Sequence, residues 1–204
     1  MLHMPADPLP DEALVIDTPR LRLRPYAQTD LALATATLTD PRVTRYVCDP
    51  KTPAEVAALM PLITRRGAGG RLGMWAVERR DTGATIGDGI LTPLPIDAPD
   101  TDWASLDPGR YPDAEIEVGY MLLPEAWGQG FATEICTALL RFAFTRTALA
   151  EIVAITDPDN AASQRVLVKS GMIPEGARRA YGETCPAFRL TRDQWHDGAT
   201  QPEP

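Results

Sequence analysis

A strand, a glycine-rich loop and a helix follow one another in the middle of this chain, and that order restricts the fold more than any other feature. Residues 114–123 read as a strand, and residues 131–145 place apolar side chains at the helical period. Residues 150–156 form an apolar run typical of a buried strand. The helix is entered through residues 128–130, Gly-Gln-Gly. The pattern predicts a β-α-β unit within an α/β protein.

The loop at residues 128–130 suits a phosphate group. Small residues allow backbone N–H groups to approach a ligand, and the first turn of a helix has unpaired N–H groups and a partial positive charge. The loop alone does not separate this site from a turn that only requires positive φ. A nicotinamide-nucleotide fingerprint ranks last, because its sixth position is Thr133 and the acid expected further on would be Asp157, in an Asp-Pro turn.

The rest of the chain reads as one domain over residues 13–198, with a flexible arm at 1–12 and a flexible tail at 199–204. Strands are predicted over 13–24, 73–79, 84–91, 114–123, 150–156, 172–181 and 186–191, and helices over 28–38, 53–66, 131–145, 161–170 and 191–197. Residues 92–113 contain five prolines and five aspartates. We expect an insertion loop there, because both flanks read as strands of one sheet; it is either a mobile surface loop or part of a substrate entrance.

Composition excludes several classes of function. The 204 residues include 20 basic and 28 acidic ones, a net charge of −8, which argues against a nucleic-acid binder and favours a cationic or amine substrate. No apolar run is long enough to span a membrane, and we find no secretory signal. The three cysteines lack the spacing of a disulfide framework or a zinc site, and the two histidines stand near the termini. We therefore expect no metal and a cytoplasmic location.

Three stretches, taken together and in this order, resemble the GNAT superfamily of acyl-CoA N-acyltransferases, and within it the branch of Rim-type ribosomal-protein N-terminal acetyltransferases. They are residues 18–24 (TPRLRLR), residues 117–122 (EVGYML) with 127–134 (WGQGFATE), and residues 160–167 (NAASQRVL) continuing to 169–172 (KSGM). The resemblance covers about residues 14–192. Each stretch is weakly specific, and their combination is specific.

The resemblance implies a mixed, mostly antiparallel central sheet flanked by helices. Strands 114–123 and 150–156 would splay apart and form the cleft for acetyl-CoA, the co-substrate. The cofactor contacts that it implies are the pantetheine arm on the backbone of Met121, Leu122 and Leu123, the pyrophosphate on the amides of Gly128, Gln129, Gly130, Phe131, Ala132 and Thr133, and the pantetheine again on Asn160. Two positions depart from the family pattern: Trp127, although Trp is usual in the Rim-type branch, and Leu167, where many relatives have the tyrosine that acts as general acid.

Acetylation of an amine requires a base near the amine and an acid near the departing thiolate. Glu115, Glu117 and Gly119 share one face of their strand, and Glu117 lies closer to the cofactor loop, so we expect it to be the base. The alternative is that both glutamates form a solvated face. Ser163 is the expected substitute for the missing tyrosine, because Rim-type relatives place a serine at this spacing from Asn160. The alternatives here are a local backbone bond of Ser163 and a plain helix N-cap at Asn160.

These observations predict an acetyl-CoA-dependent N-acetyltransferase that acts by direct transfer in a ternary complex. The acceptor would be a primary amine, either a protein N-terminus or a small molecule, with no nucleic-acid or membrane partner. A homodimer is compatible with the sequence, which does not fix an oligomeric state. The competing interpretation is a non-catalytic acyl-CoA-binding module on the same fold, and Leu167 is the residue that supports it.

Overall fold

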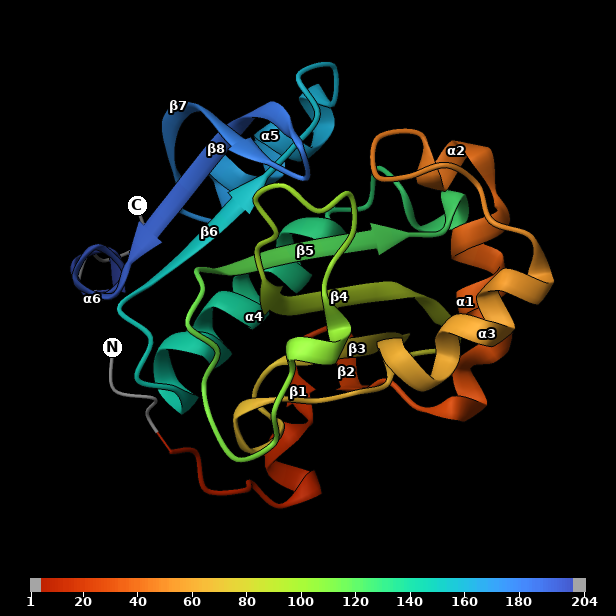
Figure 1. The fold of residues 1–204 in the computed structure, drawn as a ribbon, viewed down its shortest axis with the longest axis horizontal. Coiled ribbons are helices and arrows are strands. Elements are labelled where there is room, and N and C mark those ends of the chain that lie inside the picture. Colours follow the sequence, from red (N-terminus) through yellow and green to blue (C-terminus); the bar gives the residue numbers. More distant parts are fainter. Residues whose placement is uncertain (1–4, 200–204) are drawn as a thin grey trace.

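We describe residues 5–199 from a computed structural model, with side chains through residue 196. Within these residues, eight strands form one sheet in the order β1-β2-β3-β4-β5-β6-β8-β7 (Figure 1). The strands are β1 (Ile16–Asp17), β2 (Leu21–Pro25), β3 (Gly73–Arg79), β4 (Thr85–Pro93), β5 (Ile116–Leu122), β6 (Glu151–Ile155), β7 (Ile173–Ala180) and β8 (Glu183–Thr191). All neighbours are antiparallel except β5 and β6, which are parallel. The expected mixed, mostly antiparallel sheet is confirmed.

Helices cover the sheet unevenly. The α-helices are α1 (Leu31–Thr39), α2 (Pro41–Thr44), α3 (Pro53–Ile63), α4 (Phe131–Arg146), α5 (Ala161–Lys169) and α6 (Arg192–Ala199). Short 3-10 turns are η1 (Asp11–Leu14), η2 (Gln28–Asp30), η3 (Ala68–Gly70), η4 (Trp103–Ser105) and η5 (Pro124–Ala126). Figure 1 shows α4 behind the sheet, and the segment that joins β4 to β5 crosses in front of it. The two faces of β5 therefore meet different surroundings.

The helix α4 packs through the apolar stripe that its sequence predicts. Ile135 and Leu139 are fully buried, and Phe142 is 5% exposed. Gly89 on β4 makes room for them, because a Cβ at that position would lie 2.8 Å from a Leu139 methyl group. Close packing of this kind fixes the height of the helix above β4 and β5, and it thereby fixes where the amino end of α4 stands relative to β5.

The amino-terminal region corrects two predictions. Residues 13–24 are not one strand: β1 and β2 form an antiparallel hairpin, and the turn between them is closed by the Leu21 N–H, which donates to Thr18 Oγ1 (2.9 Å). Proline at position 19 cannot donate a ladder hydrogen bond, which explains the interruption. One residue of the predicted flexible arm is anchored to the domain, since Ala6 is 8% exposed and its N–H donates to Gly109 O. Residues 1–4 and 200–204 of the arm and tail lie outside the described range.

The segment between β4 and β5, residues 94–115, is called the insertion below. It begins two residues later than the sequence suggested, because Thr92 and Pro93 belong to β4. Its one short element is η4, as the prolines predict, and most of its residues are exposed, while a few buried side chains anchor it to the rest of the protein. Leu106 is 1% exposed, and Trp103 packs against both of the larger hydrophobic clusters. The insertion therefore covers the front of the sheet as an anchored segment.

A search of the described helices found none with the length and apolar character that crossing a membrane requires.

Candidate active site

The parallel strands β5 and β6 meet at one point and then diverge. Their one register pair is Glu117 with Val153, whereas β5 pairs with β4 all the way to Leu122. The carboxyl half of β5 therefore has no strand on its β6 side. Alternate residues of a strand direct their backbone groups to opposite edges. Because Leu123 donates its N–H to Ile86 O on the β4 side (2.9 Å), Leu122 faces the open gap.

The backbone groups around this gap differ in how many partners they already have. Both groups of Leu123 are used inside the protein, since its carbonyl accepts from the Ala126 N–H (2.9 Å). The Leu122 carbonyl accepts from the Trp127 indole Nε1 (2.7 Å), while its N–H faces the gap. Backbone pairing with a ligand thus fits Leu122 and corrects the expectation for Leu123, whose groups are already paired.

The loop before α4 has the backbone geometry of an anion site. Gly128 and Gly130 both have left-handed φ values, 71° and 78°, and no heavy atom lies within 4 Å of a Cβ placed at Gly128. Gly130 is the N-cap residue and no side chain caps the helix, so first-turn N–H groups from Phe131 to Thr133 stay available. The loop and the β5–β6 gap together fit an extended ligand that ends in a pyrophosphate.

Arg20 holds this loop, and the sequence analysis gave it no role. Its Nη1 donates to Gln129 O (2.9 Å), its Nε donates to Glu134 Oε2 (2.6 Å), and its guanidinium lies 4.5 Å from the centre of the Phe131 ring. Thr18 Oγ1 donates to the other Glu134 oxygen (2.6 Å). The stretches 18–24 and 127–134, which were noticed separately in the sequence, are therefore in direct contact.

Asn160 and Ser163 sit across the gap, at the start of α5. Asn160 Oδ1 accepts the Ser163 N–H (3.1 Å), which confirms the N-cap interpretation of Asn160. Ser163 Oγ lies 3.0 Å from the Tyr120 hydroxyl of β5. Burial raises the pKa of Tyr120, so the phenol remains protonated at neutral pH. The sequence analysis missed Tyr120, although strand alternation places it two residues before Leu122 and on the same side of β5. Leu167 is 1% exposed and packs in the core.

Glu117 is the buried carboxyl of the site. It is 4% exposed, and its Oε1 accepts a hydrogen bond from the Tyr181 hydroxyl in the β7–β8 turn. Burial raises the pKa of Glu117 to about 8, although the Tyr181 hydrogen bond acts to lower it. The alternative of a solvated face is wrong for this residue. A carboxyl with this pKa exchanges its proton within reach of neutral pH, and it becomes able to accept a proton as the pH rises towards 8.

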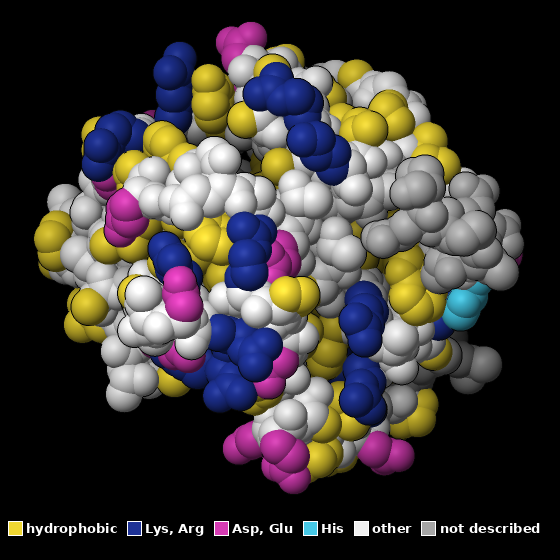
Figure 2. Space-filling view, turned by 180° about the vertical axis from the view of Figure 1, so that it is seen from behind, with side chains coloured by type: hydrophobic (Ala, Val, Ile, Leu, Met, Phe, Trp, Pro, Cys, Tyr) yellow, Lys and Arg dark blue, Asp and Glu magenta, His cyan; other side chains and the backbone are white. Residues whose placement is uncertain are grey.

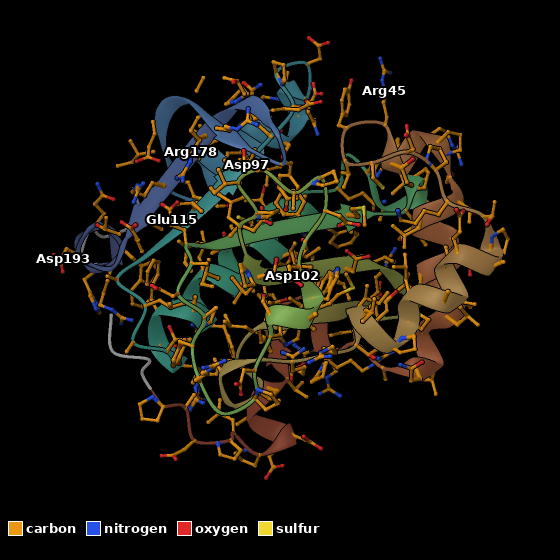
Figure 3. The ribbon with its side chains drawn as sticks, viewed as in Figure 1. Arg45, Asp97, Asp102, Glu115, Arg178 and Asp193 are labelled. Atoms are coloured by element: carbon orange, nitrogen blue, oxygen red, sulfur yellow. The ribbon has the colours of Figure 1, made fainter. Side chains whose placement is uncertain are left out.

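Glu115, two residues earlier, has the opposite environment. It receives hydrogen bonds from Arg178 Nη1 (3.1 Å) and Arg189 Nη2 (3.3 Å), and Figure 3 labels Glu115 and Arg178. The Arg178 hydrogen bond is the largest cause that lowers the pKa of Glu115. Glu115 is thus a permanently charged partner of arginines.

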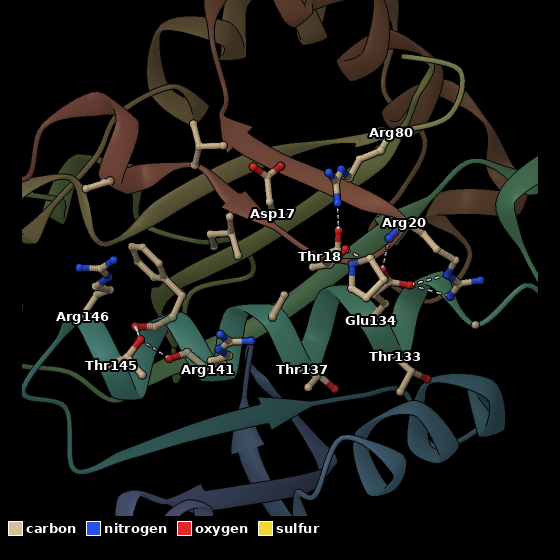
Figure 4. Close-up of a pocket in the computed structure, with 17 residues that line it drawn as sticks. Asp17, Thr18, Arg20, Arg80, Thr133, Glu134, Thr137, Arg141, Thr145 and Arg146 are labelled. Atoms are coloured by element: carbon tan, nitrogen blue, oxygen red, sulfur yellow. Dashed lines mark hydrogen bonds and ion pairs between the residues drawn. The ribbon is translucent and has the colours of Figure 1, made fainter. Parts of the chain in front are cut away.

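A groove of the structure lies elsewhere, between α4 and the β1 region (Figure 4). It has a volume of about 800 Å³ and is lined by residues of α4 and of the β1 region, among them Arg80, Arg141 and Arg146. Figure 2 shows that basic side chains gather on this rear face. The groove reaches Gly130 and Thr133 but not Glu117, Tyr120 or Ser163. We therefore take the β5–β6 gap, with the titratable groups Glu117 and Tyr120 beside it, as the candidate site. Among the described residues, no group of His, Cys, Asp and Glu side chains could hold a metal ion.

Known proteins share this architecture. The family model for the acetyltransferase (GNAT) domain matches residues 20–173. An uncharacterized N-acetyltransferase, YoaA of Bacillus subtilis, is 29% identical over 174 residues, which cover 82% of this chain and 87% of the relative. The ribosomal-protein-S5-alanine acetyltransferase of Vibrio fischeri superposes with a TM-score of 0.66 at 18% identity, covering 89% of this chain and 98% of that one. An aminoglycoside acetyltransferase solved with coenzyme A gives 0.67 at 17% identity, covering 88% and 99%. A strand pair that parts beside a glycine loop, together with a family model that spans most of the sequence, shows that the chain belongs to the GNAT acetyltransferase family.

Proposed function

We propose that this protein transfers the acetyl group of acetyl-CoA directly to a primary amine, with Glu117 as the general base. The observation that carries the proposal is the placement of Glu117: a buried carboxyl stands where β5 and β6 part, at the inner end of the gap that leads to the loop before α4. The acetyl thioester supplies the electrophilic carbonyl carbon. Everything else in the reaction is positioning and proton transfer.

Different residues around the gap would bind different parts of acetyl-CoA. We propose that the amides of Gly128, Gln129, Gly130, Phe131, Ala132 and Thr133 hold the pyrophosphate. The Leu122 N–H would pair with the pantetheine arm, with Met121 beside it and Asn160 on the far side. The absence of a side-chain cap on α4 supports this assignment, because the helix N–H groups then remain free for the anion. Arg20 would fix the loop from behind.

The departing thiolate needs a hydrogen-bond donor, and two hydroxyl groups beside the gap are candidates for it. We propose that Tyr120 and Ser163 act as a pair, since their oxygens lie 3.0 Å apart across the gap. The raised pKa of Tyr120 keeps its proton in place, so its hydroxyl can donate to a developing negative charge. Ser163 alone is a poor acid, and the contact with Tyr120 gives it a defined partner.

The acceptor side favours a small amine over a folded protein's N-terminal segment. The insertion covers the face that carries Glu117 and is joined to the β7–β8 turn, where Tyr181 N–H donates to Pro95 O (3.0 Å) and Gly182 N–H to Ile96 O (2.9 Å). Arg179 also pairs with Asp97 (2.6 Å). A long peptide on this face would have to displace these contacts.

The unpaired state of the three cysteines supports a reducing, cytoplasmic setting.

The test is release of thiol from acetyl-CoA in the presence of spermidine, kanamycin and an alanine-terminated peptide. The proposal expects turnover with at least one amine and a loss of about 10²-fold or more in the Glu117→Gln variant. Coenzyme A binding without turnover, unaffected by that substitution, would establish the non-catalytic module instead. Faster turnover of the peptide than of the small amines would reverse the preference inferred from the insertion.

A further inference from the structure

A hydroxyl group without a partner lies beside the proposed base. Thr92 is fully buried, and its Oγ1 has no hydrogen-bond partner, one of three such side-chain atoms among the described residues. The other two, on Arg66 and Ser170, belong to other parts of the fold. Thr92 is the register partner of Glu117 across β4 and β5. Directly opposed residues point to the same face, with Cβ atoms about 4.5–5.5 Å apart, so both side chains face the insertion.

Glu117 has free hydrogen-bonding capacity on that same face. The Tyr181 hydroxyl donates to its Oε1, and we find no hydrogen bond to its Oε2 from any described residue. Thr92 and Glu117 do not hydrogen-bond to each other either. One small polar atom placed between these two neighbouring groups would give both of them a hydrogen-bond partner.

The remaining surroundings explain why no other side chain fills this role. Tyr181 is the titratable group in contact with Glu117, and behind it the insertion contributes Asp100 and Thr101, which interact with the phenol. On the strand itself, Glu115 is engaged by Arg178 and Arg189. None of the hydrogen bonds or ion pairs that we find among the described residues joins a cation to Glu117, and burial without a cationic partner agrees with its raised pKa.

We propose that Thr92 and Glu117 together hold the acceptor nitrogen and thereby select a primary amine. This inference rests on the proposed acetyl transfer. One N–H donates to Glu117 Oε2, the other donates to Thr92 Oγ1, and the lone pair points to the β5–β6 gap. As the nitrogen–carbon bond forms and the carbon–sulfur bond breaks, the proton of the first N–H passes to Glu117. The departing thiolate accepts a hydrogen bond from the Tyr120–Ser163 pair and takes its proton from solvent. A secondary amine has one N–H and leaves one of the two groups unpaired, which is costly in a buried site.

The first arm of the test does not depend on finding the acceptor. A water molecule in the position of the nitrogen would link Thr92 to Glu117 in the free protein, so removing the hydroxyl withdraws support from the carboxylate. We expect Thr92→Val to raise the pKa of Glu117 by about half a unit to one unit, and Thr92→Ser to leave it unchanged. The readout is a carbon-13 NMR titration of the Glu117 carboxyl, assigned with Glu117→Gln.

An unchanged pKa in Thr92→Val would overturn the proposal, and so would an equal shift in Thr92→Ser, since that variant keeps the hydroxyl and loses only the methyl group. Valine matches threonine in shape, and the hydroxyl it replaces has no partner in the protein, so we expect the variant to fold. Should it fail to fold, Thr92→Ala takes its place with the same expected shift.

The second arm measures selectivity. For the best primary amine of the panel and its N-methyl derivative, the wild-type protein should prefer the primary amine by roughly tenfold or more in kcat/KM. Thr92→Val should reduce that preference to a few-fold, and Thr92→Ser should restore it. A preference that survives in Thr92→Val contradicts the two-point arrangement. If the wild-type protein acetylates no amine at all, the proposed function fails, while the titration still decides the link between Thr92 and Glu117.

Discussion

Glu115 and Glu117 stand two residues apart on one face of one strand, and their surroundings make them chemical opposites. Two arginines surround Glu115 and hold the pKa of its carboxyl below the usual value. Glu117 is buried against a tyrosine, with its pKa raised to about 8. The difference comes from the elements above them: β7 and β8 bring arginines to the first position, and the β7–β8 turn brings Tyr181 to the second. The position of a glutamate on the strand makes it a candidate base, and the side chains packed against it determine whether its carboxyl is charged at neutral pH.

Removing each carboxylate in turn gives the largest expected effect. Glu117→Gln should lower kcat/KM by about 10²–10⁴-fold, because the amine then has no proton acceptor. Glu115→Gln should change it less than threefold. Thiol release from acetyl-CoA measures both. Equal losses would show that Glu117 has no distinct role.

The thermal stability of Glu117→Gln provides the control for folding. The folded-state pKa of Glu117 lies above the ordinary value of 4.5, so the folded protein binds more protons than the unfolded chain between about pH 4.5 and pH 8. Stability is therefore lost as the pH rises through that window. The glutamine variant lacks this penalty, and its Tm relative to wild type should increase from pH 5 to pH 8. A variant whose Tm falls at both pH values would be a folding defect.

The pH profile examines the contact with Tyr181. In the wild type, kcat/KM should rise as Glu117 loses its proton, with a midpoint near pH 8. Since the Tyr181 hydrogen bond lowers the pKa of Glu117, Tyr181→Phe should move the midpoint upward and reduce activity at pH 7 by up to about tenfold. Tyr111→Phe, in the insertion but outside this contact, is the matched control. The same pH profile in all three proteins would show that Tyr181 does not influence the pKa of Glu117.

Cofactor binding at the loop that follows β5 should be separable by mutation from the proton transfer proposed for Glu117. Gly130→Ala forces a left-handed φ on a residue with a Cβ, which costs about 1–2 kcal/mol. If the backbone relaxes to relieve this strain, coenzyme A binding should weaken by about fivefold or more, with no change in the pH midpoint. Gly171→Ala, with a φ of 88° and open space around it, imposes similar strain away from the loop and should leave coenzyme A binding intact. Isothermal titration calorimetry distinguishes the two variants.

The smallest effect is expected at the arginine-bound position. Arg178→Met removes one partner of Glu115 and leaves Arg189, and both carboxylate and guanidinium are partly exposed. The free energy of unfolding should fall by no more than about 1 kcal/mol, and kcat/KM should remain within twofold of wild type. Urea unfolding measures the first quantity. A large loss of activity would mean that Glu115 communicates with the base.

The local parts of the fold and site were readable from sequence. Apolar periodicity and glycine punctuation predicted β5, the loop, α4 and β6, and strand alternation with proximity to the loop selected Glu117. The strand predicted over residues 13–24 was wrong, because the turn at Pro19 outweighed the alternating pattern. Asn160 showed its capping role through its position before α5.

The remaining contacts depend on tertiary structure. Arg20 meets Glu134 across 114 positions, and Tyr181 meets Glu117 across 64. The register that sets Thr92 opposite Glu117 spans the whole insertion. One sequence cannot indicate such pairings, because each partner taken alone resembles an ordinary surface or strand residue. What the sequence could offer was the list of candidate groups, and the fold decided which of them meet.

Tyr181 has a left-handed φ of 53°, which is unusual for a residue of its size, and backbone hydrogen bonds to Pro95 and Ile96 hold the turn there. The phenol that lowers the pKa of the proposed base is thus anchored by a loop that contributes no residue to the proposed proton transfer. Exchanging or shortening that loop would retune the working pH of the enzyme with every reacting group unchanged. Two proteins with identical catalytic residues could then operate in different pH ranges, and loop exchange becomes a practical route to engineering that range.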